Sequence, residues 1–269
     1  MAVVLDARDL NKRFGAVTAA NGVSAAIEQD SVVGLIGTNG AGKTTFINMI
    51  TGYIKPDTGS IHFRGRDITA LAPREITRVG ICRSFQIPQL YASLSVFENM
   101  MVSLGVVLRN AGLGGFFSRG RPNVPGYDAP AEEVAERILE RFGLGDYRDK
   151  NAQVLPGGVR KLLDIALTMA AKPSILLLDE PTSGVSAEEK FGMMEMVMAA
   201  VKAEGATVLF VEHDMEVVSR FAERVLAFYD GRIIADAAPE IALTDPEVKR
   251  YVVGGELHRM DEQKGAANA

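Results

Sequence analysis

The eight residues from Gly37 to Thr44 constrain the fold of this chain more than any other segment. They read Gly-Thr-Asn-Gly-Ala-Gly-Lys-Thr and contain every fixed position of the pattern G-x-x-x-x-G-K-[ST]. The glycines let successive backbone N–H groups turn towards phosphate oxygens, where a side chain would block their approach. The apolar segment 32–36 predicts a buried strand before the loop, and segment 44–50 predicts a helix after it. This order of elements indicates an α/β fold that binds a nucleoside triphosphate.

Different side chains of the predicted loop are expected to bind ATP and Mg²⁺. Lys43 reaches the β- and γ-phosphates, and the Thr44 hydroxyl binds Mg²⁺. The helix that begins near Thr44 directs its N-terminal dipole at the anion. The residues predicted to contact the nucleotide here are Gly37, Thr38, Asn39, Gly40, Ala41, Gly42, Lys43, Thr44 and Thr45.

The composition narrows the class of protein. The chain has 269 residues, of which 47% are hydrophobic and 23% charged, and this is ordinary for a globular protein with a sizeable core. The net charge of −5 argues against an extended nucleic-acid surface, so no nucleic-acid partner is expected.

Cys82 is the only cysteine, which excludes an intrachain disulfide and suits a reducing compartment. No apolar run approaches the roughly 20 residues of a spanning helix, so we expect a cytoplasmic protein that reaches a membrane only through a partner.

The order of patterns along the chain predicts one domain with an insertion. Segments 3–5, 22–27 and 59–65 predict antiparallel strands around the phosphate loop. Helical periodicity dominates from about residue 88 to 173, as in segments 131–142 and 160–171, and apolar runs at 175–178 and 207–211 flank a predicted helix at 187–203. We therefore expect one domain over residues 1–255 and a flexible tail at 256–269. Its α/β core with an antiparallel β subdomain covers 1–87 and 174–255, and the inserted helical subdomain covers 88–173.

Polar residues that follow apolar runs are candidates for the chemistry. Asp179 and Glu180 come directly after the run 175–178, where a parallel sheet presents ligand-binding groups. Asp179 is suited to hold Mg²⁺ beside Thr44, and Glu180 to orient and deprotonate the attacking water. Gln86 and His213 also end apolar stretches, so each is predicted at the same edge near the γ-phosphate.

Together with Phe14 and the segment 155–158, which reads Leu-Pro-Gly-Gly, these motifs resemble the nucleotide-binding subunit of ATP-binding-cassette (ABC) transporters over essentially the whole chain. A closer resemblance is to importer ATPases of the branched-chain amino acid type, and it rests on segments 80–86, 113–117, 211–215 and 245–251. The resemblance implies an ABC-type phosphate-loop NTPase core that hydrolyses ATP to power transport. It also implies that Phe14 stacks on adenine, Gln86 senses Mg²⁺ and water, Glu180 is the general base and His213 braces the γ-phosphate.

The same resemblance implies partners. Two cassettes pair head to tail, and each ATP lies between the phosphate loop of one and the signature loop of the other, here with Gly157 and Gly158. The partner cassette is a paralogue or a second copy, and permease subunits and an extracytoplasmic solute-binding protein complete the system. The cassette then lies at the cytoplasmic face of the inner (cell) membrane as a peripheral subunit. Segment 87–94 is expected to receive a cytoplasmic helix of the permease; ordinary packing within the subdomain is the alternative.

The chain departs from the family pattern at two places. Segment 155–159 reads Leu-Pro-Gly-Gly-Val where Leu-Ser-Gly-Gly-Gln is usual, and Ser186 stands where many relatives have aspartate. Pro156 offers neither a hydroxyl nor a backbone N–H to a phosphate. These departures predict an asymmetric heterodimer, in which a paralogue supplies the better signature loop.

Other functions stay open at this stage. A lipopolysaccharide-exporting ATPase shares the C-terminal pattern. Two further alternatives are less well supported: a soluble cassette that acts on nucleic acid or ribosomes, and a kinase or GTPase with a phosphate loop. The chain has neither the coiled-coil insertion nor the second cassette that is usual in soluble relatives, and the Gln86, Gly157–Gly158 and His213 set counts against a kinase or GTPase. The transported solute is not encoded in this chain, and branched-chain amino acids, amides and small aromatic acids all fit.

Overall fold

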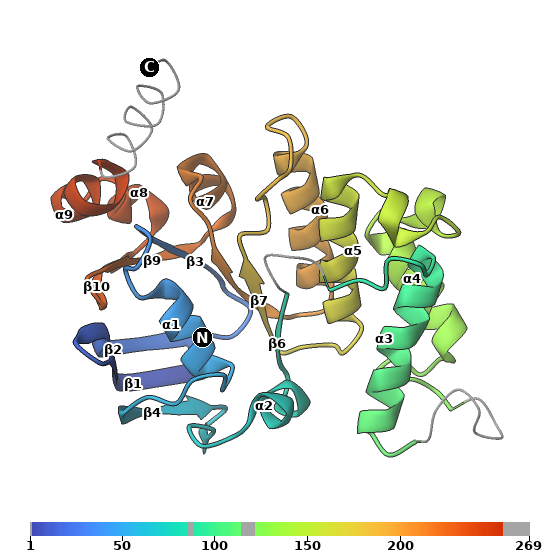
Figure 1. The fold of residues 1–269 in the computed structure, drawn as a ribbon, viewed down its shortest axis with the longest axis horizontal. Helices are drawn as coiled ribbons and strands as arrows, with labels where there is room; N and C mark the ends of the chain where they lie inside the picture. The colour runs from blue at the N-terminus through green and yellow to red at the C-terminus, as the bar shows by residue number, and fades with distance from the viewer. Residues whose placement is uncertain (1, 85–88, 114–121, 255–269) are drawn as a thin grey trace. The chain divides into compact units, whose positions relative to one another are not determined.

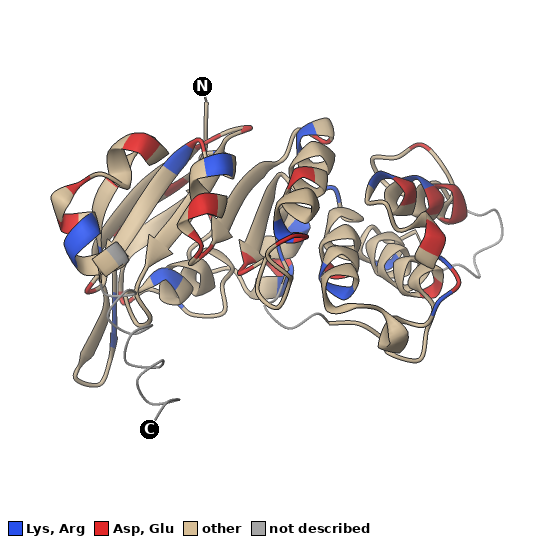
Figure 2. Ribbon diagram, turned by 90° about the horizontal axis from the view of Figure 1, so that it is seen from above, with Lys and Arg blue, Asp and Glu red and all other residues tan. Residues whose placement is uncertain are grey.

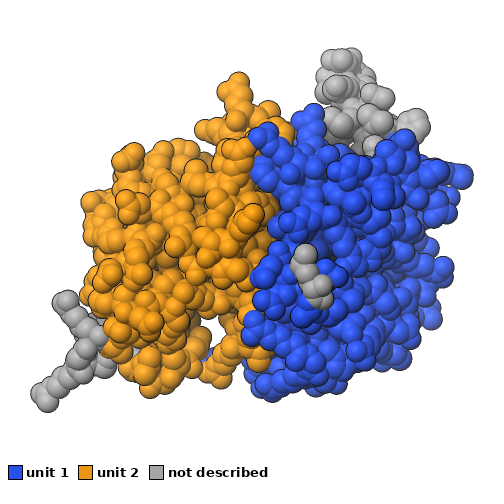
Figure 3. Space-filling model, turned by 180° about the vertical axis from the view of Figure 1, so that it is seen from behind, with its two compact units in different colours: residues 1–76, 209–269 blue, residues 77–208 orange. Residues whose placement is uncertain are grey.

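The computed structural model describes residues 2–84, 89–113 and 122–254. The chain divides into two compact units, one made of residues 1–76 and 209–269 and the other of residues 77–208 (Figure 3). The second unit is larger than the predicted helical subdomain, since it also includes strands on either side. The predicted borders at 87/88 and 173/174 stay a prediction, as does the flexible tail at 256–269, which lies outside the described residues.

Strands dominate the first unit (Figure 1). Its elements are β1 (Val3–Phe14), β2 (Val17–Glu28), β3 (Val32–Gly37), α1 (Lys43–Ile50), β4 (Thr58–Phe63), β5 (Arg66–Asp67), α7 (Met215–Phe221), β9 (Arg224–Tyr229), β10 (Arg232–Ala237), α8 (Pro239–Ala242), α9 (Pro246–Val248) and a π-helical turn (Lys249–Val253). The borders between the units fall inside α2 (Pro73–Val79) and β8 (Thr207–Val211).

One sheet of the first unit is the predicted antiparallel subdomain, with strand order β2-β1-β4-β5 and antiparallel pairing throughout. Strands β1 and β2 are 12 residues each, longer than the predicted segments 3–5 and 22–27. Cross-strand hydrogen bonds extend them through residues of low strand propensity, such as Asp6 opposite Ala26 and Lys12 opposite Ala20. Leu5, Leu10 and Ile27 are fully buried and form the core of this sheet.

The other sheet of the first unit carries the phosphate loop. Its strands follow the order β10-β9-β3, and β9 lies parallel to β3 with Gly37 opposite Phe228. Helix α1 packs on this sheet through Phe46, whose ring centroid lies 5.4 Å from that of Phe228. Residues 209–211 of β8 lie on the other side of β3, and the Glu212 N–H donates to the Leu35 carbonyl at 3.4 Å.

The second unit is mainly helical. Its elements are β6 (Ile81–Arg83), α3 (Val96–Asn110), α4 (Ala131–Arg141), two 3₁₀ turns (Gly145–Tyr147 and Ala152–Val154), α5 (Gly157–Met169), β7 (Ile175–Asp179) and α6 (Lys190–Ala203). Strands β6 and β7 pair in parallel, and the Thr207 N–H donates to the Ser174 carbonyl directly before β7.

Two helices of the second unit begin at residues other than those predicted. Helix α5 begins at Gly157 rather than near residue 160. Pro156 is its N-cap and has an extended conformation, and the next two residues, both glycines, are the first residues of the helix. Helix α6 begins at Lys190 rather than near residue 187, since Ser186 and Glu189 form a hydrogen-bonded turn before it.

Charged residues are distributed over both units. Figure 2 shows Lys and Arg interspersed with Asp and Glu in each of them. None of the helices described in residues 2–84, 89–113 and 122–254 is both long and apolar enough to cross a membrane.

Candidate nucleotide-binding site

The phosphate loop connects β3 to α1 and requires glycine at both of its ends. Gly37 has a φ of 149°, and a Cβ there would lie 2.5 Å from the Phe228 carbonyl oxygen. Gly42 has a φ of 111°, and a Cβ there would lie 2.8 Å from the Ala19 carbonyl oxygen. Both positions combine a backbone conformation that side chains avoid with a close approach of another backbone. The loop is therefore held in shape by its neighbours.

Lys43 is directed back along this loop. Its side chain is buried, with 5% of the residue exposed, and its Nζ donates to the carbonyl oxygens of Gly37 and of Thr38, the latter at 3.0 Å. By contrast, Asn39, Gly40 and Thr44 are exposed. The N-cap of α1 is Gly42, which has no side chain to accept hydrogen bonds from the first N–H groups of the helix. An anion can therefore approach these N–H groups.

A hairpin that the sequence analysis did not single out supports the loop. Asp230 and Gly231 connect β9 to β10 with positive φ values of 46° and 72°, as a two-residue hairpin turn requires. The Gly231 N–H donates to the Ala41 carbonyl at 3.0 Å, and the Gly231 carbonyl accepts from the Asn21 N–H at 2.8 Å. This turn thus joins the loop to β2. The Asp-Gly pair between two strand-forming segments is the signal that could have revealed it.

Phe14 and His213 lie in the same unit as the loop. Phe14 ends β1 at the hairpin opposite Val17 and is 47% exposed, so its ring is accessible for stacking. His213 follows β8 two residues after Val211, and its N–H donates to Oε2 of the buried Glu212 at 3.2 Å. Asp214 then caps α7 through the Glu216 N–H at 2.9 Å. The strand that leads to His213 therefore adjoins the strand that leads to the phosphate loop.

The two predicted carboxylates lie at the end of β7 in the second unit. Asp179 is the last residue of β7, and its Oδ2 accepts a charge-assisted hydrogen bond from Nη2 of Arg83. Its backbone carbonyl accepts from Nζ of the buried Lys161 at 3.4 Å. Glu180 has a left-handed conformation with a φ of 47°, which is strained for a residue with a side chain by about 1–3 kcal/mol. The Glu180 carbonyl accepts a hydrogen bond from the Ser183 N–H at 3.1 Å, so this conformation begins the turn that follows the strand.

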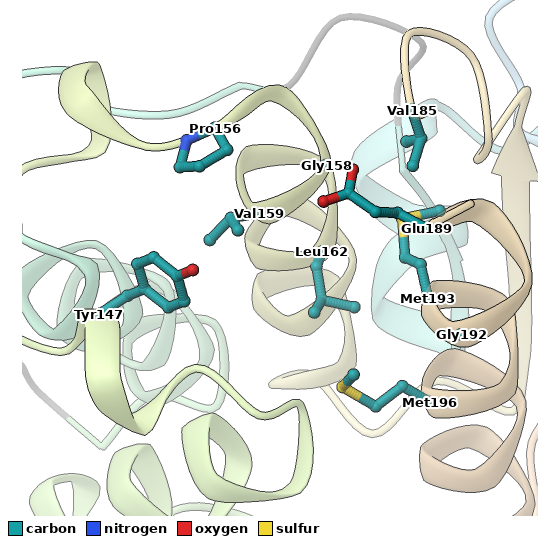
Figure 4. Close-up of a pocket in the computed structure, with 10 residues that line it drawn as sticks. All are labelled: Tyr147, Pro156, Gly158, Val159, Leu162, Val185, Glu189, Gly192, Met193 and Met196. Atoms are coloured by element: carbon teal, nitrogen blue, oxygen red, sulfur yellow. The ribbon is translucent and has the colours of Figure 1, made fainter. Parts of the chain in front are cut away.

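The signature segment borders a cavity of about 310 Å³ in the second unit (Figure 4). Its lining is mostly apolar and comes from the 3₁₀ turn that ends at Tyr147, from the beginning of α5, from the segment before α6 and from α6 itself. The lining residues are Tyr147, Pro156, Gly158, Val159, Leu162, Val185, Glu189, Gly192, Met193 and Met196. A Cβ at Gly157 would lie 3.5 Å from the Gly184 carbonyl oxygen, and one at Gly158 would lie 3.5 Å from Cγ1 of Val185. The signature glycines therefore pack against the turn that follows Glu180.

Some predicted residues lie outside the described residues. They are Gln86, both as a catalytic residue and as a Mg²⁺ ligand, the beginning of the permease segment at Ile87 and Pro88, and residues 114–117.

The donor groups suit Mg²⁺. Within the described part of the chain, no group of three or more His, Cys, Asp or Glu side chains could hold a metal ion. Mg²⁺ is usually bound by one or two protein oxygens together with phosphates and water. The Thr44 hydroxyl and the Asp179 carboxylate are oxygen donors of this kind.

The strand, glycine loop and helix with a buried lysine define a nucleotide-binding α/β protein of the phosphate-loop class. Residues 20–183 match the family model of the ABC transporter. A protein of Archaeoglobus fulgidus named a probable branched-chain amino acid transport ATP-binding protein, LivG, is 35% identical over 94% of this chain and 96% of its own length. The high-affinity branched-chain amino acid transport ATP-binding protein BraF of Pseudomonas aeruginosa is 33% identical over 93% of this chain and 98% of its own.

Solved structures agree with these relatives. An ATP-binding cassette of an ABC transporter in its ADP conformation has a TM-score of 0.78 and 31% identity, and covers 93% of this chain and 98% of its own. The chain belongs to the ABC transporter family, as its motifs predicted. Its predicted fold, an ABC-type α/β core with ATPase chemistry, is confirmed at the level of the family.

Proposed function

We propose that this chain is the ATP-binding and ATP-hydrolysing subunit of an importer for branched-chain amino acids or related small organic solutes. The observation that carries the proposal is the intact phosphate loop in a chain that matches branched-chain amino acid transport subunits along nearly its whole length. The subunit acts as a peripheral protein at the cytoplasmic face of the inner (cell) membrane. The subunit acts together with permease subunits, which carry the solute across the membrane. A solute-binding protein takes part indirectly.

The proposed mechanism assigns a role to each site residue. The loop 37–45 encloses the phosphates, and Lys43 turns from the Gly37 and Thr38 carbonyls to the β- and γ-phosphates. Phe14 stacks on the adenine. Thr44, Gln86 and Asp179 hold Mg²⁺, which neutralises phosphate charge when it is bound.

The remaining residues act on the attacking water and the γ-phosphate. Glu180 accepts the proton of the water as general base, from its place directly after β7. His213 orients the γ-phosphate from the end of β8, and Gln86 contributes to placing the water. Proton transfer to a positioned carboxylate contributes about 10²–10⁴-fold to such a rate.

A second cassette is proposed to complete each site. Gly157 and Gly158 begin α5, so their N–H groups can bind the γ-phosphate of an ATP held by the partner cassette. The missing serine at position 156 removes one hydrogen bond to a charged group, worth about 1.5–3 kcal/mol. A paralogue with a complete signature loop would close the ATP held by this chain more tightly, so we infer a heterodimer, with a homodimer of this chain as the alternative.

Segment 89–94 is the proposed contact with the permease. Tyr91 is 59% exposed, although the backbone around it is tightly held. Its N–H donates to Oδ1 of Asn99 at 2.9 Å, and the carbonyls of Ala92 and Leu94 accept from Gln153 and Ala152 at 3.0 and 2.9 Å. An exposed aromatic residue on a rigid backbone is typical of a docking position.

Transport by the assembled system tests the proposal. The chain, the paralogous cassette and the permease are reconstituted in proteoliposomes with the solute-binding protein, and uptake of labelled leucine is measured with and without ATP. We expect ATP-dependent uptake that Lys43→Ala abolishes. ATP-dependent export of a lipid-linked saccharide without uptake would favour the lipopolysaccharide exporter, and copurification with ribosomes instead of membranes would favour a soluble cassette.

The heterodimer is tested by ATPase measurements on the chain alone and after addition of the paralogue. We expect strong stimulation by the paralogue. Vigorous, cooperative turnover by the single chain would contradict the asymmetric arrangement.

A further inference from the structure

Arg83 forms an ion pair with the carboxylate that is proposed to bind Mg²⁺. Its Nη2 donates to Oδ2 of Asp179, and the two side chains are only 10% and 14% exposed. Moving either charge out of water is costly unless an opposite charge lies next to it. The pair is much less exposed than other ion pairs of the second unit, such as that between Arg148 and Glu136.

The register of the sheet dictates this contact. Strands β6 and β7 are parallel, and Arg83 lies opposite Leu177. Asp179 is two residues further along β7 and so projects on the same face as Leu177, diagonally next to Arg83. The Ser84 N–H donates to the Leu177 carbonyl at 2.9 Å and fixes the end of β6 in this register.

A second cation lies close to the same residue. Nζ of Lys161, on α5, donates to the Asp179 backbone carbonyl at 3.4 Å. The Asp179 carboxylate is thus paired with one cation and its backbone carbonyl with another, both within the second unit. A divalent cation that binds this carboxylate meets the positive charge of Arg83 at short range, and in a partly buried site such repulsion is only weakly screened.

We propose that Arg83 is the resident counter-ion of Asp179 and that Mg²⁺ must displace it. Without nucleotide, Arg83 holds the carboxylate in place and neutralises it. With nucleotide, Arg83 competes with Mg²⁺, so it lowers the affinity of the site for the metal. This inference rests on the proposed function, because it takes Asp179 as a Mg²⁺ ligand.

The test measures how strongly Mg²⁺ promotes nucleotide binding. The dissociation constant of a fluorescent, non-hydrolysable ATP analogue is determined in EDTA and in excess Mg²⁺, and the ratio of the two constants reports the coupling between metal and nucleotide. We expect Arg83→Gln to increase this ratio about tenfold or more, because one competing charge is removed. Arg83→Lys keeps the charge and is expected to stay within about threefold of the unmodified chain.

A matched control removes another arginine–aspartate pair. Arg224→Gln breaks the Arg224–Asp236 pair, at 2.5 Å, in the other unit and is expected to leave the ratio unchanged. Arg83→Met, which fills the buried volume with an apolar chain, serves as the neutral variant if Arg83→Gln does not fold. In the background of Asp179→Asn, neutral replacement of Arg83 is expected to have no further effect on the ratio.

Several outcomes would overturn the inference. An unchanged or smaller ratio in a folded neutral variant shows that Arg83 does not compete with Mg²⁺. A ratio for Arg83→Lys as high as that of the neutral variant shows that the charge is not the cause. If the unmodified chain fails to bind the analogue in EDTA and in Mg²⁺ alike, the proposed function fails with it, whereas normal binding with an unaltered ratio contradicts only the role of Arg83.

Discussion

Two glycines of the phosphate loop allow the effect of a close backbone contact to be measured separately from the effect of backbone conformation. Gly40 and Gly42 both have positive φ values, 81° and 111°. A Cβ at position 40 would have no heavy atom within 4 Å. A Cβ at position 42 would lie 2.8 Å from the Ala19 carbonyl oxygen and 3.3 Å from Cα of Gly231. Gly40→Ala and Gly42→Ala are therefore a matched pair of substitutions.

The expected magnitudes follow from these contacts. A left-handed conformation destabilises alanine by about 1–2 kcal/mol relative to glycine, and this applies to both variants. In Gly42→Ala, backbone of β2 and of the β9–β10 turn must also move, since neither contact is the end of a flexible side chain. Overpacking of this kind adds about 1–3 kcal/mol. We expect Gly42→Ala to lower the free energy of unfolding by about 1–3 kcal/mol more than Gly40→Ala does.

Urea denaturation, followed by circular dichroism, measures this difference. For the unmodified chain and the two variants, the free energy of unfolding is extrapolated linearly to zero urea. Equal slopes against urea concentration indicate that each protein exposes the same surface area on unfolding. Equal free energies of unfolding for the two variants would show that β2 and the hairpin turn do not press against the loop. A greater loss in Gly40→Ala would contradict the packing argument altogether.

The remaining predictions concern the signature segment and the cysteine. Pro156→Ser restores a hydroxyl at the N-cap of α5. We expect ATP turnover of the assembled transporter to rise about tenfold, because the hydroxyl adds one hydrogen bond to a charged phosphate. An unchanged rate would show that position 156 does not reach the phosphate. Burial raises the pKa of the Cys82 thiol from 9.0 to about 11, so at pH 8 the folded chain should react with a thiol reagent only after unfolding in urea. Because the folded state retains this proton more tightly, the stability that Cys82 contributes is complete below pH 9.0 and is lost as the pH rises towards 11, which unfolding measured at several pH values will detect. Rapid labelling of the folded chain at pH 8 would contradict the burial of Cys82.

Local patterns predicted the elements that carry the site. The glycines at 37 and 42 and the apolar run before them specify the strand, loop and helix, because each of these depends on residues close in sequence. Asp179 and Glu180 were also predicted at the end of β7, since a short apolar run bounded by polar residues indicates where a buried strand ends.

Contacts between distant segments could not be predicted in this way. Arg83 and Asp179 are 96 residues apart, and only the register of β6 on β7 makes them neighbours. The approach of Ala19 to Gly42 likewise depends on how β2 folds back on the loop. The beginning of α5 at Gly157 was missed because proline and glycine usually indicate a turn, whereas here Pro156 is the N-cap of the helix.

The central claim, that this chain binds ATP at its phosphate loop and hydrolyses it with Glu180, is tested most directly by one comparison. Phosphate release and the affinity for ATP are measured for the unmodified chain and for Glu180→Gln, each assembled with its partner cassette. The account predicts that Glu180→Gln loses turnover by about 10²-fold or more, as for loss of a general base, and binds ATP as well as the unmodified chain. Undiminished hydrolysis in Glu180→Gln would remove Glu180 from the role of base, and failure of the unmodified chain to bind ATP would contradict the claim as a whole.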